Sequence, residues 1–227
     1  MTVHVEPGTV VLYTDVACGW ATVQLHRFYA ARAEAGLDEH VRVDHRLFLL
    51  EDVNSMPLPK GLVDAEIPTF TDMVPDFGFR AWRRDASQWP ITTLLTNEAV
   101  HAAKTQSLAA AEELDMALRK ALFARSRAVS MLHEILAVAE KCESVDADAL
   151  AAALDDGRAR GQMMRDYRGR DESVQGSPHL FLADGSDVHN PGIEFHWEGG
   201  GEGQGDLVLD SDDPQAMALL VRRAVVR

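Results

Sequence analysis

The chain has 227 residues, of which 46% are hydrophobic and 26% charged, so it is long enough to bury one large core or a core that carries an insertion. Its 36 acidic residues outnumber its 22 lysines and arginines, and the formal net charge of -14 at pH 7 repels nucleic acid and anionic membrane surfaces. We therefore expect neither nucleic acid nor a membrane as a partner. Residues 1–8 carry no basic stretch followed by an apolar one, and no window approaches the roughly 18 apolar residues that span a bilayer, so we expect a cytoplasmic protein.

The first elements predicted along the chain are a strand, a helix and a second strand. Residues 9–13 form a short β-branched and apolar run. A pattern of helical period follows from residue 20 to residue 35, and Gly36 supplies the stop. Residues 41–50 alternate at first and then become continuously apolar, which is typical of a strand buried at one end. Two parallel strands joined by a helical crossover make a βαβ unit.

The middle of the chain is dominated by helical patterns. Residues 51–90 hold several prolines among scattered aromatic residues, and this composition predicts irregular loops and short helical pieces. Three helical patterns rich in Ala, Leu, Met and Glu follow, at residues 96–123, 129–142 and 146–153. Together they predict a helical subdomain.

The last part of the chain returns to strands. A helix is predicted over residues 157–167, and two short segments, 180–182 and 187–189, flank an Ala-Asp-Gly-Ser turn as the strands of a hairpin do. Residues 214–225 have one apolar face and are predicted to form a final helix. Parallel strands early and antiparallel strands late predict an α/β domain with a mixed sheet.

Cys18 lies where the first predicted strand gives way to the first helix. The free amides and the positive dipole end of that helix would face its sulfur, favour the thiolate and lower the thiol pKa. The alternative is a small buried hydrophobic residue. Ser177 and Pro178 stand between a helix and a strand, where a cis peptide recurs in tight turns, although an ordinary trans proline also fits.

Two segments resemble a known family. Residues 13–21, Tyr-Thr-Asp-Val-Ala-Cys-Gly-Trp-Ala, are similar to the active-site segment of DsbA-like oxidoreductases, a group with FrnE, 2-hydroxychromene-2-carboxylate isomerase and kappa-class glutathione transferase relatives. Residues 176–178, Gly-Ser-Pro, resemble that family's cis-proline loop. The resemblance implies a thioredoxin-like fold with a large helical insertion. Residues 1–55 and 156–227 then form a discontinuous thioredoxin-like domain, and residues 56–155 form the inserted subdomain.

The motif departs from the family pattern at two positions. The redox members carry Cys-Pro-x-Cys, whereas here Gly19 stands in the proline position and Ala21 replaces the second cysteine. Any redox cycle must therefore release its mixed disulfide with an external thiol, and glutathione or another small thiol such as mycothiol is the expected co-substrate, with no tightly bound cofactor. Gly19 also loosens the start of the helix. Cys142 ends a predicted helix and stays unassigned.

Further residues are candidates by their position near the motifs. Trp20 either walls the thiol pocket or simply packs, and the imidazole of His179 either approaches the sulfur or is half-buried. The residues expected to bind the thiol or substrate are Gly19, Trp20, Ala21, Ser177, Pro178 and His179. Asp15 is expected to end the strand in solvent, and the alternative is a buried carboxylate that tunes the proton affinity of the thiol.

Three further features are weaker candidates. His189, Glu194 and His196 lack the spacing of metal ligands, so no metal site is expected, and the alternative is that they overhang the active site from the segment after the hairpin. The glycine-rich residues 199–206 predict a flexible surface loop rather than a phosphate loop. The basic residues 80–84 predict a solvated helix face, and the alternative is a patch that holds the carboxylates of a peptide thiol.

The sequence supports three functional hypotheses. The first is a DsbA-like thiol-disulfide oxidoreductase that attacks a disulfide-containing substrate as a monothiol through Cys18. The second is a glutathione-type isomerase or transferase, although those relatives usually carry Ser at this position. The third is a thioredoxin-like module that binds an extended segment without chemistry, as loss of the second cysteine allows. A depressed Cys18 pKa favours an enzyme and an unshifted or raised one favours the binding module; a homodimer is compatible with each.

Overall fold

The computed structural model describes residues 3–225. They include a four-stranded mixed sheet and the helices that pack around it. Strand β1 (Thr9–Thr14) pairs in parallel with β2 (Arg42–Leu47), and its other edge pairs antiparallel with β3 (His179–Phe181). Strand β4 (Asp187–His189) completes the order β2-β1-β3-β4. The predicted βαβ unit and the later hairpin are both confirmed.

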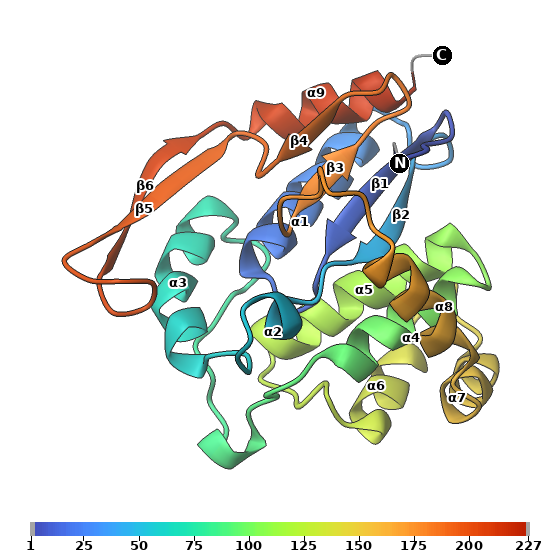
Figure 1. Ribbon diagram of the computed structural model, residues 1–227, viewed down its shortest axis with the longest axis horizontal. Coiled ribbons are helices and arrows are strands. Elements are labelled where there is room, and N and C mark those ends of the chain that lie inside the picture. The colour runs from blue at the N-terminus through green and yellow to red at the C-terminus, as the bar shows by residue number, and fades with distance from the viewer. Residues whose placement is uncertain (1–2, 226–227) are drawn as a thin grey trace.

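Helices α1 (Gly19–Glu34) and α9 (Gln215–Ala224) pack together over one face of this sheet (Figure 1). Phe28 of α1 and Met217 of α9 are fully buried with Leu12 of β1 in one apolar cluster. The helix predicted for residues 214–225 is therefore confirmed, and its apolar face closes the core behind β1.

Between β2 and β3 the chain is mainly helical. The helices are α2 (Leu50–Val53), α3 (Lys60–Met73), α4 (Leu94–Lys104), α5 (Leu108–Phe123), α6 (Leu132–Ala139), α7 (Ala147–Asp155) and α8 (Arg158–Arg168), with a 3-10 turn at Ala86–Gln88. The pattern predicted as one helix over residues 96–123 is two helices, because Ser107 caps α5 by accepting a hydrogen bond from the Ala110 amide. In Figure 1, helices α4 to α8 form one group, in which α4, α5 and α8 contact β2.

The prediction of irregular structure over residues 51–90 is wrong in part, because α3 runs for 14 residues through this segment with Pro68 inside it. Val63, Ile67 and Phe70 lie on one buried face of α3. A proline inside a helix costs about 3 kcal/mol, and burial of each large apolar side chain contributes about 1.5 to 3 kcal/mol. The apolar face therefore outweighs the proline.

A second sheet, absent from the sequence prediction, follows β4. Strands β5 (Ile193–Glu198) and β6 (Asp206–Asp212) form an antiparallel ribbon that extends beside α3 (Figure 1). The expected surface loop over residues 199–206 is mostly the turn of this ribbon, and Asp206 already belongs to β6. The ribbon is anchored because the guanidinium of Arg27 in α1 binds both carboxylate oxygens of Asp212, the second at 2.8 Å.

Candidate active site

Cys18 is the N-cap of α1 and joins two segments far apart in sequence. Its Sγ accepts a hydrogen bond from the Ala21 amide at 3.3 Å, as an N-cap side chain does. The same thiol donates to the Ser177 carbonyl oxygen at 3.1 Å, across 159 positions of the chain. The peptide bond between Ser177 and Pro178 is cis. The structure thus brings the two sequence motifs into direct contact.

The predicted low pKa of the Cys18 thiol is wrong. The side chain is only 6% exposed, and burial raises the thiol pKa to about 11. The hydrogen bonds with Ser177 and Ala21 and the nearby charge of Arg119 act in the opposite direction, but they do not offset desolvation. At neutral pH the residue is therefore a thiol, which agrees with its donation to the Ser177 carbonyl.

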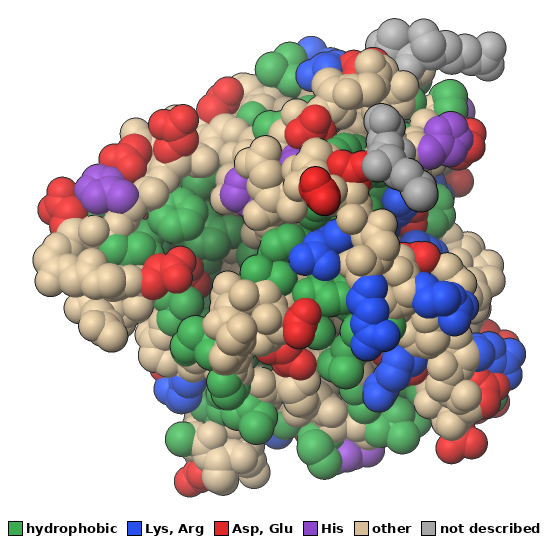
Figure 2. All heavy atoms as spheres, viewed as in Figure 1, with side chains coloured by type: hydrophobic (Ala, Val, Ile, Leu, Met, Phe, Trp, Pro, Cys, Tyr) green, Lys and Arg blue, Asp and Glu red, His purple; other side chains and the backbone are tan. Residues whose placement is uncertain are grey.

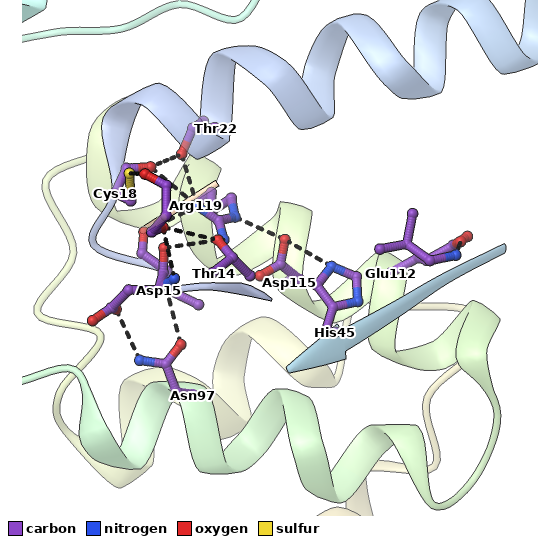
Figure 3. Close-up of polar contacts among 12 residues, drawn as sticks. Thr14, Asp15, Cys18, Thr22, His45, Asn97, Glu112, Asp115 and Arg119 are labelled. Atoms are coloured by element: carbon purple, nitrogen blue, oxygen red, sulfur yellow. Dashed lines mark hydrogen bonds and ion pairs between the residues drawn. The ribbon is translucent and has the colours of Figure 1, made fainter. Parts of the chain in front are cut away.

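A buried arginine of α5 holds the start of α1 from behind. Arg119 donates to the Cys18 carbonyl oxygen at 3.2 Å and to Oγ1 of Thr22 at 3.0 Å (Figure 3). Its Nη2 reaches Oγ1 of Thr14 at 2.9 Å, and its Nε pairs with Asp115 at 2.7 Å. Because this guanidinium is fully buried and paired, it orients the Cys18 backbone and β1 together.

Asp15 is fully buried, which corrects the expectation that it ends β1 in solvent. One carboxylate oxygen accepts from the Ala17 amide at 2.9 Å, and from Thr93 and Asn97 at 2.8 Å each (Figure 3). The other accepts from the Leu50 amide at 3.0 Å. The carboxylate therefore ties the loop before Cys18 to the starts of α2 and α4.

Cys18 lies in the wall of a cavity of about 290 Å³. The start of α1, the segment from α2 to α3, the cis-proline loop and the β5–β6 ribbon enclose it. Figure 2 shows this face of the molecule, with hydrophobic side chains in the hollow beside the ribbon and acidic ones near them. Its acidic lining residues are Asp15, Glu51, Glu66 and Glu202.

Trp20 both packs and walls the cavity. Its indole stacks on Phe195 of the ribbon with ring centroids 4.0 Å apart and an interplanar angle of 8°, and it meets Phe70 of α3 edge to face. Its Nε1 donates to Oε1 of Glu66 at 2.9 Å. The indole thus connects α1, α3 and the ribbon around the thiol.

Gly19 is required by close packing, which corrects the expectation of a loosened helix start. A Cβ at this position would lie 2.6 Å from Cζ of Phe70 and closer still to Cε2. Phe70 is fully buried in α3, so its ring cannot move into solvent. The ring occupies the space that the proline of the family motif would need.

Glu66 of α3 lines the cavity and was not among the residues predicted from the sequence. Burial raises the pKa of this carboxyl to about 8; the hydrogen bond from Trp20 lowers it, and the charge of Glu202 raises it further. A helical period through Val63, Ile67 and Phe70 places Glu66 beside the buried face, so this signal was present in the sequence.

The remaining candidates lie outside the cavity wall. His179 is fully buried; its Nδ1 accepts from the Gln175 amide and its Nε2 contacts Asp187, so its imidazole does not approach the sulfur. Ala21 and Pro178 likewise lie behind the wall, whereas Gly19, Trp20 and Ser177 line it. Cys142 donates to the Val138 carbonyl at 3.6 Å, away from the cavity.

The histidines near the glycine-rich segment have partners other than a metal. His196 pairs with Asp210 and Glu198, and His189 packs against Gly176. Within residues 3–225 no group of three or more His, Cys, Asp or Glu could hold a metal ion. In the same range no helix is long and apolar enough to cross a membrane.

Comparison with known proteins finds one family profile and several solved structures of similar fold. The family profile of the DSBA-like thioredoxin domain matches residues 9–196. Among curated proteins there is no match. A solved structure from Streptomyces coelicolor, described as a "probable DsbA oxidoreductase", is 20% identical, with a TM-score of 0.62 over 95% of this chain and 89% of its own. The cytosolic disulfide reductase DsbM of Pseudomonas aeruginosa, solved with GSH, is 17% identical, with a TM-score of 0.59 over 80% of this chain and 89% of its own. The predicted thioredoxin-like fold with a helical insertion is confirmed.

Proposed function

The chain belongs to the DSBA-like thioredoxin domain family, and on that premise we propose that it is a thiol-disulfide oxidoreductase that works with the single thiol of Cys18. The observation that carries this proposal is the position of the sulfur. It caps α1, contacts the cis-proline loop and lies in the wall of a cavity large enough for a small molecule. A packed structural cysteine has no need of such access.

The proposed exchange has two steps. The Cys18 thiolate attacks one sulfur of a disulfide, so that a new S–S bond forms at Cys18 while the substrate S–S bond breaks and its second half leaves as a thiolate, which takes up the proton that Cys18 lost. Ala21 offers no second thiol, so an external thiol attacks the mixed disulfide and regenerates Cys18. Each cycle consumes one disulfide and one thiol and yields one of each.

The pKa of Cys18 supports a reducing direction. Oxidants of this chemistry stabilise the thiolate of the reduced form, whereas burial keeps Cys18 a neutral thiol at neutral pH, so its reduced form lacks the stabilisation that makes such proteins oxidising. The similar fold of a cytosolic disulfide reductase solved with GSH is consistent with this direction, with a cytoplasmic location and with a small thiol as co-substrate.

The test is turnover of a small disulfide, bis(2-hydroxyethyl) disulfide, with a small thiol as the second substrate. We expect Cys18→Ala to reduce the rate to that of the uncatalysed reaction and Cys142→Ala to retain it, because Cys142 does not line the cavity. Equal activity in Cys18→Ala and the wild type would overturn the proposal.

The raised pKa of Cys18 also favours a second candidate, a binding module in which the thiol is inert. Such a module would hold an extended segment along the cis-proline loop. It differs from the enzyme in the same assay, because neither the wild type nor any variant would then exceed the uncatalysed rate.

The domain boundaries and the oligomer also belong to this proposal. We place the inserted helical subdomain at residues 56–155, between thioredoxin-like segments 1–55 and 156–227.

Met131 and Leu132 near the start of α6 are half-exposed apolar residues, and they support a homodimer formed through the insertion. Sedimentation of the wild type beside a Leu132→Ser variant tests this, because a monomeric wild type contradicts it.

A further inference from the structure

The wall of the cavity beside Cys18 is acidic. We propose that it selects small thiols and disulfides that carry a positive charge, such as amine-bearing ones, over anionic ones such as glutathione. The inference rests on the proposed thiol-disulfide exchange for the role of the sulfur, and it adds the chemical class of the co-substrate.

The first support is the composition of the cavity wall. Its charged members within the described part of the chain are four carboxylate residues, and it contains no Lys, Arg or His. Two of the four, Asp15 and Glu51, accept hydrogen bonds from protein groups. They contribute negative potential, but their oxygens are already engaged.

The second support is an oxygen left free for a ligand. Glu66 is only 9% exposed, and its Oε1 accepts from Trp20, whereas its Oε2 has no hydrogen bond with any residue of the described range. A nearly buried carboxylate with one unpaired oxygen in a cavity wall is suited to a donor or a cation from the ligand.

The third support is a second carboxylate from another element of the cavity wall. Glu202 lies in the turn of the β5–β6 ribbon, lines the same cavity, and has no hydrogen-bond partner within residues 3–225. Glu66 and Glu202 interact electrostatically across the two elements, which shows that they are close. Because burial and the charge of Glu202 raise the pKa of Glu66 to about 8, both carboxylates are charged above that pH, and an ammonium group between them would then satisfy both and relieve their repulsion.

No nearby cation offsets this potential within the described residues. Arg119 lies behind Cys18 rather than in the cavity wall, and its charge is paired with Asp115. Glutathione carries two carboxylates and one ammonium at neutral pH, so it would bring negative charge against carboxylates in a partly desolvated site. For charges about 4 Å apart and an effective dielectric of about 20, reversing one ligand charge changes affinity by about tenfold or more.

The test compares three disulfides of similar length: cystamine with two ammonium groups, bis(2-hydroxyethyl) disulfide with none, and 3,3′-dithiodipropionate with two carboxylates. The rate of mixed-disulfide formation at Cys18 is measured by intact mass in the Cys142→Ala protein at pH 8.5, above the pKa of about 8 of Glu66, so that this carboxylate carries its charge. Each rate is divided by that of a neutral free thiol, N-acetylcysteine amide, with the same disulfide. We expect cystamine to exceed dithiodipropionate at least tenfold after this normalisation.

Two variants locate the effect. Glu66→Gln keeps an acceptor for Trp20 and Glu202→Gln lies in an exposed turn, so both should fold, and each is expected to reduce the preference at least threefold. Glu198→Gln removes the same charge from the same ribbon outside the cavity wall and is expected to leave the preference unchanged. Equal normalised rates, an anionic preference, or an equal loss in Glu198→Gln would overturn the inference.

A binding measurement separates this inference from the exchange chemistry. In a Cys18→Ser variant, cystamine and dithiodipropionate are titrated while the NMR signal of the Trp20 indole N–H is followed, since that group donates to Glu66. Tighter binding of cystamine by tenfold supports charge selection even if wild-type Cys18 proves unreactive, which would overturn only the proposed function. No difference between the two ligands would overturn charge selection even if Cys18 exchanges.

Discussion

Replacement of Gly19 by alanine tests how the motif is built into the fold. The new methyl group would overlap the ring of Phe70, which is fully buried and has no free space to enter. Overpacking of this kind costs about 1 to 3 kcal/mol of the free energy of unfolding. Gly61 is the matched control, because it also lies in the first turn of a helix and a methyl group added there would meet no atom within 4 Å. Gly61→Ala should be neutral or stabilising by up to about 1 kcal/mol.

A double-mutant cycle with Phe70→Leu identifies the cause. Leucine lacks the two ring atoms nearest to position 19, so the Gly19→Ala change should be tolerated better beside it. We measure the free energy of unfolding in urea. We expect the sum of the losses in the two single variants to exceed the loss in the double variant by about 1 to 3 kcal/mol. Additive losses, or a Gly19→Ala variant as stable as Gly61→Ala, would refute the packing argument.

The buried titratable groups give three further predictions. Glu66 has a folded pKa of about 8 against an ordinary 4.5, so burial of its charge lowers stability increasingly as pH rises from 4.5 to 8, by up to about 5 kcal/mol. Glu66→Gln should therefore match the wild type in urea unfolding at pH 4 and exceed its stability at pH 8; parallel curves would contradict this. Asp15→Asn should lower the unfolding free energy by about 3 kcal/mol, because an amide cannot accept the hydrogen bonds of both carboxylate oxygens. The control Asp148→Asn, at an exposed position, should change it by less than about 0.5 kcal/mol. Alkylation of Cys18 by iodoacetamide in Cys142→Ala should accelerate about tenfold per pH unit up to pH 10 without levelling, and a plateau near pH 8.5 would show that burial does not raise its pKa.

Local patterns were sufficient to predict the framework of the sheet. The β-branched run before Cys18, the helical period after it and the turn between β3 and β4 are signals that lie within a few residues of the elements they specify. The two motifs at Cys18 and Ser177 also led to the correct contact, because the family resemblance places them together. Secondary structure and the centre of the site were therefore accessible from sequence.

The properties that the sequence did not predict depend on distant contacts. Asp15 is buried by partners 35 to 82 positions away, and the space at Gly19 is filled by Phe70 from another helix. The sign of the Cys18 pKa shift depends on how deeply α3 and the ribbon cover the sulfur, which no local pattern encodes. The ribbon is an exception, because Ile193, Phe195 and Trp197 of β5 alternate strictly with polar residues, a strand signal that was present in the sequence.

The central claim is that Cys18 forms a mixed disulfide that only an external thiol can resolve. Its most direct test is intact-mass analysis of the Cys142→Ala protein after reaction with bis(2-hydroxyethyl) disulfide, followed by removal of the reagent and addition of a small thiol. The account predicts a single adduct on Cys18 that persists until the thiol is added and is then released. No adduct, or an adduct that is lost without added thiol, would contradict it.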